Sequence, residues 1–265
     1  MRALLRLRMR EQKTVLLAYA LGLAVFSGIM AWSYEAFSED TGFLTQMFVQ
    51  FEDLMQAFVG VGFSLEDLTA TYLAMTWRHP LILFLLIAFG VERSSGLARE
   101  LQTGTGDLLF TLPYPRYSII FSDFLATTRG LLIINLLLVM GVYLFSLLFG
   151  VEDIPALTGF FWVFLLSFFL HLMFSALALL VATLSRTGGQ ALGWTVGIIS
   201  ILYVGDFLAS MQPQLEFIQP FTIFYHYQVS EALAGTLPLW ESAFFLGLTL
   251  IFLGGSYFFI QRRDL

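Results

Sequence analysis

The chain has 265 residues, of which 58% are hydrophobic and only 12% are charged, and its net charge is −6. About a quarter of the residues of a soluble domain are charged, so this composition excludes such a domain and predicts a protein whose surface faces lipid. The chain contains no cysteine, which excludes disulfides, thiolate metal sites and cysteine nucleophiles.

A basic segment precedes the first apolar stretch. Arg2, Arg6, Arg10 and Lys13 fall on one face of a helix, whereas Arg8 interrupts the apolar face. This pattern predicts an N-terminal amphipathic, interfacial helix whose cations bind anionic headgroups, and the alternative is a solvated start. No small-residue cleavage site follows the first apolar stretch, so we interpret that stretch as a retained span and not as a signal peptide.

Six stretches have the length and composition of membrane-spanning helices, because about 20 mostly apolar residues cross the hydrocarbon. The second stretch contains Arg78, His79 and Pro80, and we place Arg78 at the interface, where it reaches headgroups or water. The prediction is an all-α integral membrane protein with six transmembrane helices in a single domain, residues 1–265. The predicted spans are approximately 14–34, 71–91, 130–151, 156–184, 188–208 and 241–261.

The charges predict the orientation of these spans. Twelve of the thirteen Lys and Arg, together with six acids, fall on the side of the two termini. The other side has Arg78 and thirteen acids. Basic loops stay in the cytoplasm, so the N- and C-termini are both predicted to be cytoplasmic.

Two outer segments are predicted to hold amphipathic helices, one after the first span and one before the sixth. The second lies in the aromatic segment 211–239, which either dips into the outer leaflet or forms an ordinary folded loop. The first rests on apolar residues at three- and four-residue steps: Leu44, Met47, Phe48, Phe51, Leu54, Met55 and Phe58. Within the fifth span, Gly189, Gly193 and Gly197 line one face and predict the close approach of another helix.

The cytoplasmic segment 92–116 carries the most informative pattern. A polar approach beginning with Glu92 and Arg93 leads to a Gly-Thr-Gly turn, a short apolar stretch and a Pro-x-Pro stop. The apolar stretch around Leu108 and Leu109 is too short to span and too apolar to remain in water. It therefore requires a partner surface, either on the chain's own helix ends or on another protein.

In this segment the sequence resembles the permease subunits of ABC-2 type ABC transporters. The tail ending in Arg263, Asp264 and Leu265 is also similar, whereas Asp123 stands where many members carry Lys. The residues that carry the resemblance are Glu100, Gly104, Thr105, Leu108, Leu109, Pro113 and Arg116.

The resemblance implies a permease, of the exporting kind, that works with a separate ATPase subunit docked on residues 92–116. No Gly-x-x-x-x-Gly-Lys-Ser/Thr loop occurs in the chain, so ATP and Mg²⁺ are expected in that partner. The other expected partners are a second permease copy or a related permease, membrane lipid and outer-face proteins, but no nucleic acid. The expected location is a cell (plasma) membrane, as a multi-pass protein of a prokaryotic inner membrane.

Polar residues inside the spans are functional candidates. Asn135 and His171 lie within spans three and four, where they either contact substrate or hydrogen-bond a neighbouring helix. We expect no catalytic residue and no metal ligand, because the three histidines are far apart and no His-Glu-x-x-His motif occurs. This disfavours a membrane-embedded enzyme. A membrane anchor that passes ATPase motion to outer-face partners without transport stays an alternative, and a passive channel leaves the 92–116 pattern unexplained.

Overall fold

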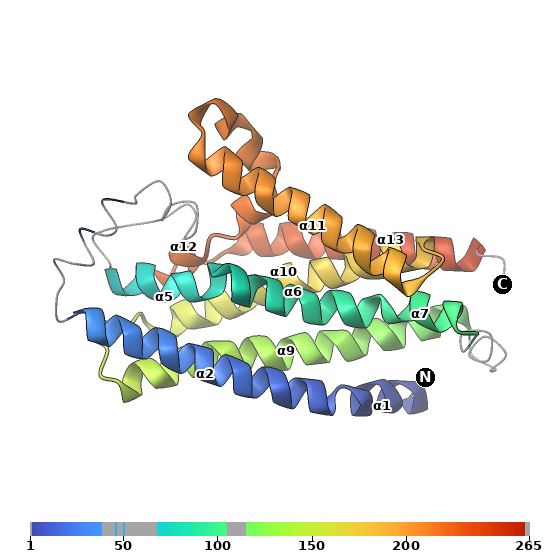
Figure 1. Cartoon of the computed structure of the whole chain (residues 1–265), viewed down its shortest axis with the longest axis horizontal. Helices are drawn as coiled ribbons and strands as arrows, with labels where there is room; N and C mark the ends of the chain where they lie inside the picture. The colour runs from blue at the N-terminus through green and yellow to red at the C-terminus, as the bar shows by residue number, and fades with distance from the viewer. Residues whose placement is uncertain (1, 39–45, 47–49, 51–67, 105–114, 263–265) are drawn as a thin grey trace.

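The computed structural model describes residues 2–38, 46, 50, 68–104 and 115–262. These residues form a bundle of long helices (Figure 1). In chain order the elements are α1 (Arg2–Glu11), α2 (Lys13–Ser38), α5 (Leu68–Arg78), α6 (Pro80–Ser94), α7 (Gly96–Gln102), α9 (Arg116–Leu148), α10 (Leu157–Leu184), α11 (Gly188–Met211), η1 (Pro213–Phe221), η2 (Phe224–His226), α12 (Val229–Leu233) and α13 (Leu239–Arg262).

Six described helices are long and apolar enough to cross a membrane, which confirms the predicted number. They cover Lys13–Ala36, Pro80–Glu100, Tyr117–Leu148, Leu157–Leu184, Gly188–Met211 and Leu239–Arg262. α1 begins and α13 ends at one end of the bundle (Figure 1), which we call the terminal end; the other is the opposite end.

The second span begins later along the chain than the sequence predicts. A helix over 71–91 was expected, but the chain divides into α5 and α6 at His79. Proline has no N–H to donate and its φ is fixed, so it is favoured in the first turn of a helix and disfavoured inside one. Pro80 accordingly starts α6, and Nδ1 of His79 caps it by accepting a hydrogen bond from Leu81 N at 3.3 Å. The apolar helix then continues to Glu100.

α10 is the central helix of the bundle and contacts α6, α9, α11, α12 and α13. Its aromatic and small side chains, among them Phe160, Phe174 and Ala178, are buried. The peripheral helices instead leave large apolar side chains exposed, such as Leu21 of α2 and Ile201 of α11. In lipid such exposure carries no hydrophobic penalty, so packing and polar contacts hold the helices together.

The segment between α11 and α13 comprises η1, η2 and α12: η1 packs beside the end of α11, and the chain then returns to the bundle, where α12 lies against α5 and α10 (Figure 1). α12 packs so closely on α10 that only glycine fits at position 159 of α10. A side-chain carbon there would collide with the carbonyl oxygen of Leu233 in α12. The predicted amphipathic helix over 44–58 lies almost entirely outside the described residues.

Arg78 does not reach headgroups or water, and that prediction is wrong. Its side chain is buried, with 7% of the residue exposed. Nη1 donates to the carbonyl oxygens of Phe224 at 3.2 Å and Tyr227 at 2.8 Å, and Nη2 lies 3.6 Å from Oδ2 of Asp206. A buried guanidinium requires such partners, and the two carbonyls come from η2 and the residue that follows it, distant in sequence from Arg78.

The glycine face of α11 makes no close helix contact within the described part of the chain. A side-chain carbon at Gly189, Gly193 or Gly197 would meet no atom within 4 Å. α11 packs through Ala191, Thr195 and Ile199, which are buried and lie two positions further along the helix. A shift of two positions is about half a turn, so the glycines face away from the bundle.

Candidate functional site

Arg8 turns toward the bundle and does not disrupt the inner face of α1. Leu5, Arg8, Met9 and Gln12 recur at three- and four-residue steps and are at least partly buried, as side chains on one helical face are. The cations at Arg6, Arg10 and Lys13 are exposed. The interruption in the sequence pattern is therefore a polar group placed on the packed face of the helix.

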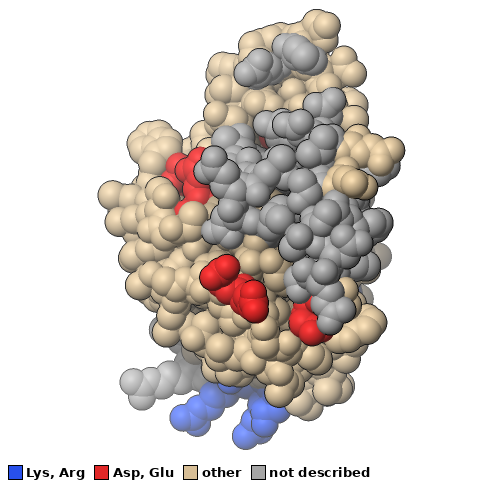
Figure 2. Space-filling view, turned by 90° about the vertical axis from the view of Figure 1, so that its left-hand side faces the viewer, with Lys and Arg blue, Asp and Glu red and all other residues tan. Residues whose placement is uncertain are grey.

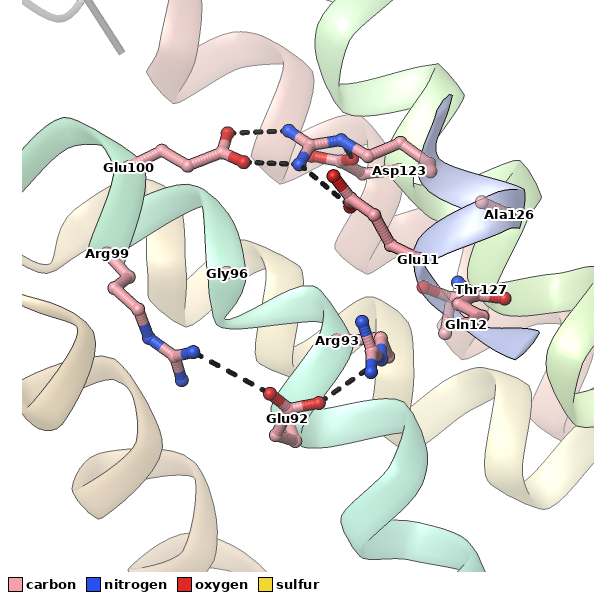
Figure 3. Close-up of a pocket in the computed structure, with 11 residues that line it drawn as sticks. Glu11, Gln12, Glu92, Arg93, Gly96, Arg99, Glu100, Asp123, Ala126 and Thr127 are labelled. Atoms are coloured by element: carbon pink, nitrogen blue, oxygen red, sulfur yellow. Dashed lines mark hydrogen bonds and ion pairs between the residues drawn. The ribbon is translucent and has the colours of Figure 1, made fainter. Parts of the chain in front are cut away.

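The guanidinium of Arg8 joins α1 to α7 and α9 through the carboxylates of Glu100 and Asp123, which are labelled in Figure 3. Nη2 donates to Oε2 of Glu100 in α7 at 2.6 Å, and Nη1 contacts the other oxygen of the same carboxylate. Nε lies 2.6 Å from Oδ1 of Asp123 in α9. Two parallel contacts to one carboxylate are the strongest geometry that arginine makes. A single side chain thus fixes α1 to α7 and α9, an arrangement we call the Arg8 clamp.

Arg8 stays charged in this setting. Burial alone would lower the pKa of its guanidinium, but the hydrogen bond to Glu100 and the charge of Asp123 outweigh it, so the pKa is raised. Only 16% of the Arg8 side chain is exposed, and 19% and 10% of those of Glu100 and Asp123. Solvent therefore screens the clamp less than it would a surface pair.

A cavity of about 180 Å³ lies beside the clamp, between α1, α6, α7 and α9. On its other wall, Glu92 is 3.2 Å from Nε of Arg93 and 3.7 Å from Nη1 of Arg99 (Figure 3). The lining residues are Arg8, Glu11, Gln12, Glu92, Arg93, Gly96, Arg99, Glu100, Asp123, Ala126 and Thr127. Charged walls and fixed ion pairs suit a mechanical joint between helix ends, and nothing in the lining indicates a catalytic constellation.

The residues predicted to couple to an ATPase differ in how far the structure describes them. Glu92, Arg93 and Glu100 line the cavity and take part in its ion pairs. Gly104 is exposed just beyond α7 with φ +76°, a left-handed conformation that favours glycine. Arg116 begins α9, but its side chain lies outside the description. Thr105, Leu108, Leu109 and Pro113 also lie outside the described residues.

The first half of the predicted loop is helical. α6 runs past Glu92 to Ser94, and α7 follows after Ser95. α7 is also held from α11, since Gly188 N donates to Oε1 of Gln102 at 3.2 Å. A side-chain carbon at Gly188 would press on Arg99. The short helix that leads into residues 105–114 is therefore held on one side by the clamp and on another by α11.

Sequence reasoning did not identify Arg8 or Asp123 as site residues. The signal was present: two uncompensated opposite charges, one on the packed face of the first helix and one in the third span's extension. α9 begins at Arg116, well before the predicted 130, so Asp123 lies within a helix. The pairing itself depends on how α1 and α9 pack, which no local pattern shows.

Asn135 and His171 lie in a buried hydrogen-bonded chain between α9 and α10. Oγ of Ser167 donates to Oδ1 of Asn135 at 2.8 Å, and Nδ2 of Asn135 donates to the Leu131 carbonyl at 2.8 Å. Nδ1 of His171 is 3.4 Å from the same Ser167 oxygen. All three side chains are buried. Asn135 thus hydrogen-bonds a neighbouring helix, one of the two roles that the sequence left open, whereas the contact of His171 with Ser167 lies within α10 itself.

Comparison with known families identifies the family of this chain. A family model described as "ABC-2 family transporter protein" matches residues 5–265, nearly the whole chain. The matched range begins in α1 and therefore includes the clamp as well as all six apolar helices. No curated protein matches the chain.

Proposed function

Because this chain belongs to the ABC-2 family of transporter proteins, we propose that it is the membrane permease subunit of an ATP-driven exporter, coupled to a separate ATPase subunit. The family is a transport membrane component, and six apolar helices make the chain a multi-pass membrane protein. The coupling element is residues 92–116, and ATP and Mg²⁺ are held by the ATPase.

The observation that carries the coupling proposal is the Arg8 clamp. α7 leads directly into residues 105–114, and the clamp connects α7 to α1 and to the start of α9. A partner that pulls on residues 105–114 acts first on α7. Because Glu100 is tied to Arg8 and through it to Asp123, the displacement passes to the first and third spans. Rigid elements joined by fixed contacts are how small movements reach distant parts of a protein.

The terminal end faces the cytoplasm in this proposal. The exposed cations Arg6 and Arg10 of α1 and Lys13 at the start of α2 lie at that end, and basic residues remain on the cytoplasmic side. α1 continues α2 along the long axis of the bundle and packs on the start of α9 (Figure 1), so in this proposal it extends into the cytoplasm and does not lie flat along the inner membrane surface, as the sequence pattern predicted. We place the protein in the plasma membrane, as in a prokaryotic inner membrane.

A second permease chain completes the transporter. The open glycine face of α11, with Gly189 and Gly193 exposed, is one surface on which another helix packs closely. Either a second copy or a related permease fills this role, and membrane lipid covers the remaining apolar surface.

One observation favours a second candidate function, that of a membrane anchor which transmits ATPase motion to outer partners. Figure 2 shows the opposite end with several exposed carboxylates, and the Lys and Arg in view lie below this surface, at the lower edge of the picture. Glu152 and Asp153 are among the exposed acids. Such a surface suits a basic protein partner. Reconstitution with the ATPase separates the two functions: ATP-driven movement of a solute or lipid supports transport, and its absence with outer partners bound supports the anchor.

The ATPase partnership is tested by affinity purification from the host membrane. The wild-type chain is expected to co-purify with a nucleotide-hydrolysing subunit. Leu109→Asp is expected to lose that subunit while inserting normally, because a charge replaces the apolar contact. Leu237→Asp at the opposite end is the matched control and is expected to retain the subunit. Unchanged association of Leu109→Asp would remove 92–116 as the docking segment.

A further inference from the structure

A cavity of about 510 Å³ lies at the opposite end, between α12 and the first turn of α13. It is formed by one continuous segment, residues 228–243. Gly235, with φ +100°, reverses the chain after α12, and Thr236 N donates to the Glu231 carbonyl at 3.0 Å. The floor is fixed, because Ala232 is buried and Leu233 packs against Gly159 of α10. The cavity is thus part of the packed fold.

Its walls are mainly apolar and open to the surroundings. Leu239 and Trp240 are each 70% exposed, and Leu237 is half exposed. These side chains lie at the start of α13, where the sixth span begins. Tryptophan is enriched at this level in membrane proteins, the interface between membrane and water. An alkyl chain that binds against these side chains either leaves water, which is favourable, or leaves lipid and exchanges one apolar contact for another.

Two carboxylates, Glu231 and Glu241, line the same cavity. The sequence supplies this end of the protein with a single cation, since Arg78 is the one Lys or Arg in residues 14–92, 130–185 and 187–261. Its guanidinium is buried against Asp206 and two carbonyl oxygens. A positive charge near Glu231 and Glu241 must therefore come from outside this chain.

We propose that this cavity binds an amphiphile with an ammonium head group, the head group held by Glu231, Glu241 and the Trp240 ring and the alkyl chain lying on Leu237 and Leu239. A cation over an indole face and next to carboxylates is a favourable and selective arrangement. An anionic head group would meet two like charges and is excluded. The binding site needs neither ATP nor an ATPase, so it stands or fails separately from the proposed transport function.

The test uses the full chain, with its co-purifying subunits, in dodecyl maltoside, an uncharged detergent. Bromine-labelled amphiphiles quench tryptophan fluorescence on contact. Two probes with identical brominated alkyl chains are titrated, one with a trimethylammonium head group and one with a sulfate. The chain has five tryptophans, so the Trp240 component is the part of the quenching that Trp240→Phe removes. Trp194→Phe, which alters an exposed tryptophan of α11, is the matched control.

The trimethylammonium probe is expected to quench Trp240 at about tenfold lower concentration than the sulfate probe, the effect of one cation–π contact reinforced by carboxylates. Glu231→Gln with Glu241→Gln is expected to abolish this preference. Glu152→Gln with Asp153→Asn, two exposed acids outside the cavity, is expected to preserve it. Equal quenching by both probes, or equal loss of preference in the two double variants, would overturn the proposal, because the effect would then be general surface charge.

Discussion

Arg78 and Asp206 form a buried ion pair, 3.6 Å from Nη2 to Oδ2, that joins α5 to α11 in the half of the protein away from the termini. Thr222 donates a hydrogen bond to the other oxygen of Asp206, and Arg78 also holds the carbonyls of Phe224 and Tyr227. The pair thus fixes the segment that returns between α11 and α13.

Replacing Arg78 by Ala is expected to destabilise the protein by about 3–5 kcal/mol, because Asp206 is left as an uncompensated buried charge. The stability of Arg78→Lys is expected to lie between those of the wild type and Arg78→Ala. An ammonium keeps the charge but lacks the planar guanidinium, which binds the carbonyls and the carboxylate together. Thermal unfolding in detergent, followed by size-exclusion chromatography, measures the effect. Asp153→Asn, at an exposed acid, is the control; an equal loss there would contradict the assignment.

The Arg8 clamp predicts energetic coupling between α1 and α7. In a double-mutant cycle of Arg8→Ala and Glu100→Ala, the coupling energy is expected to be about 1.5–3 kcal/mol, the range for hydrogen bonds to charged groups. Strictly additive single effects would mean that the contact contributes nothing. With the ATPase present, Arg8→Ala is also expected to retain ATP hydrolysis while losing ATP-driven transport. Arg6→Ala, at an exposed cation about half a turn away on α1, is expected to change neither quantity.

Gly159 predicts a steric limit on the packing of α12. Gly159→Ala is expected to displace α12 and lower the unfolding temperature, because the added carbon meets the Leu233 carbonyl, which is backbone and cannot rotate away. Gly254→Ala is the matched helical control, since nothing lies within 4 Å of that position. Limited proteolysis across residues 212–238 reports the displacement. Equal protection of this segment in the two variants would show that α12 does not depend on Gly159.

Replacing Ser167 tests whether the hydrogen-bonded residues Asn135, Ser167 and His171 serve helix packing or the substrate. Ser167→Ala removes the hydrogen bond to Asn135 and is expected to cost about 0.6 kcal/mol, and at most about 2, as interhelical hydrogen bonds in membranes do. Transport rates per folded molecule are expected to stay unchanged. A change in transported substrate without a change in unfolding temperature would instead make Asn135 and His171 part of the substrate path.

The sequence by itself determined what depends on local composition. The apolar stretches predict six spans because a helix must present about 20 apolar residues to hydrocarbon, and the structure has six such helices. The second span was placed too early because hydrophobicity averaged over about 20 residues does not show the break at His79 and Pro80. The helix begins at this break because proline has no N–H to donate. The family resemblance rested on residues 92–116 and was confirmed by the match over 5–265.

Only the tertiary structure decided which charges are paired. Arg8 appeared as a flaw in an amphipathic pattern, Asp123 as a departure from a family pattern and Arg78 as an interfacial cation, and each is instead a partner in a buried or half-buried ion pair. The partners lie 92 positions apart for Arg8 and Glu100. Hydrophobicity is a property of each segment, but the burial of a charge depends on which distant segment arrives beside it, and only the packed helices determine that.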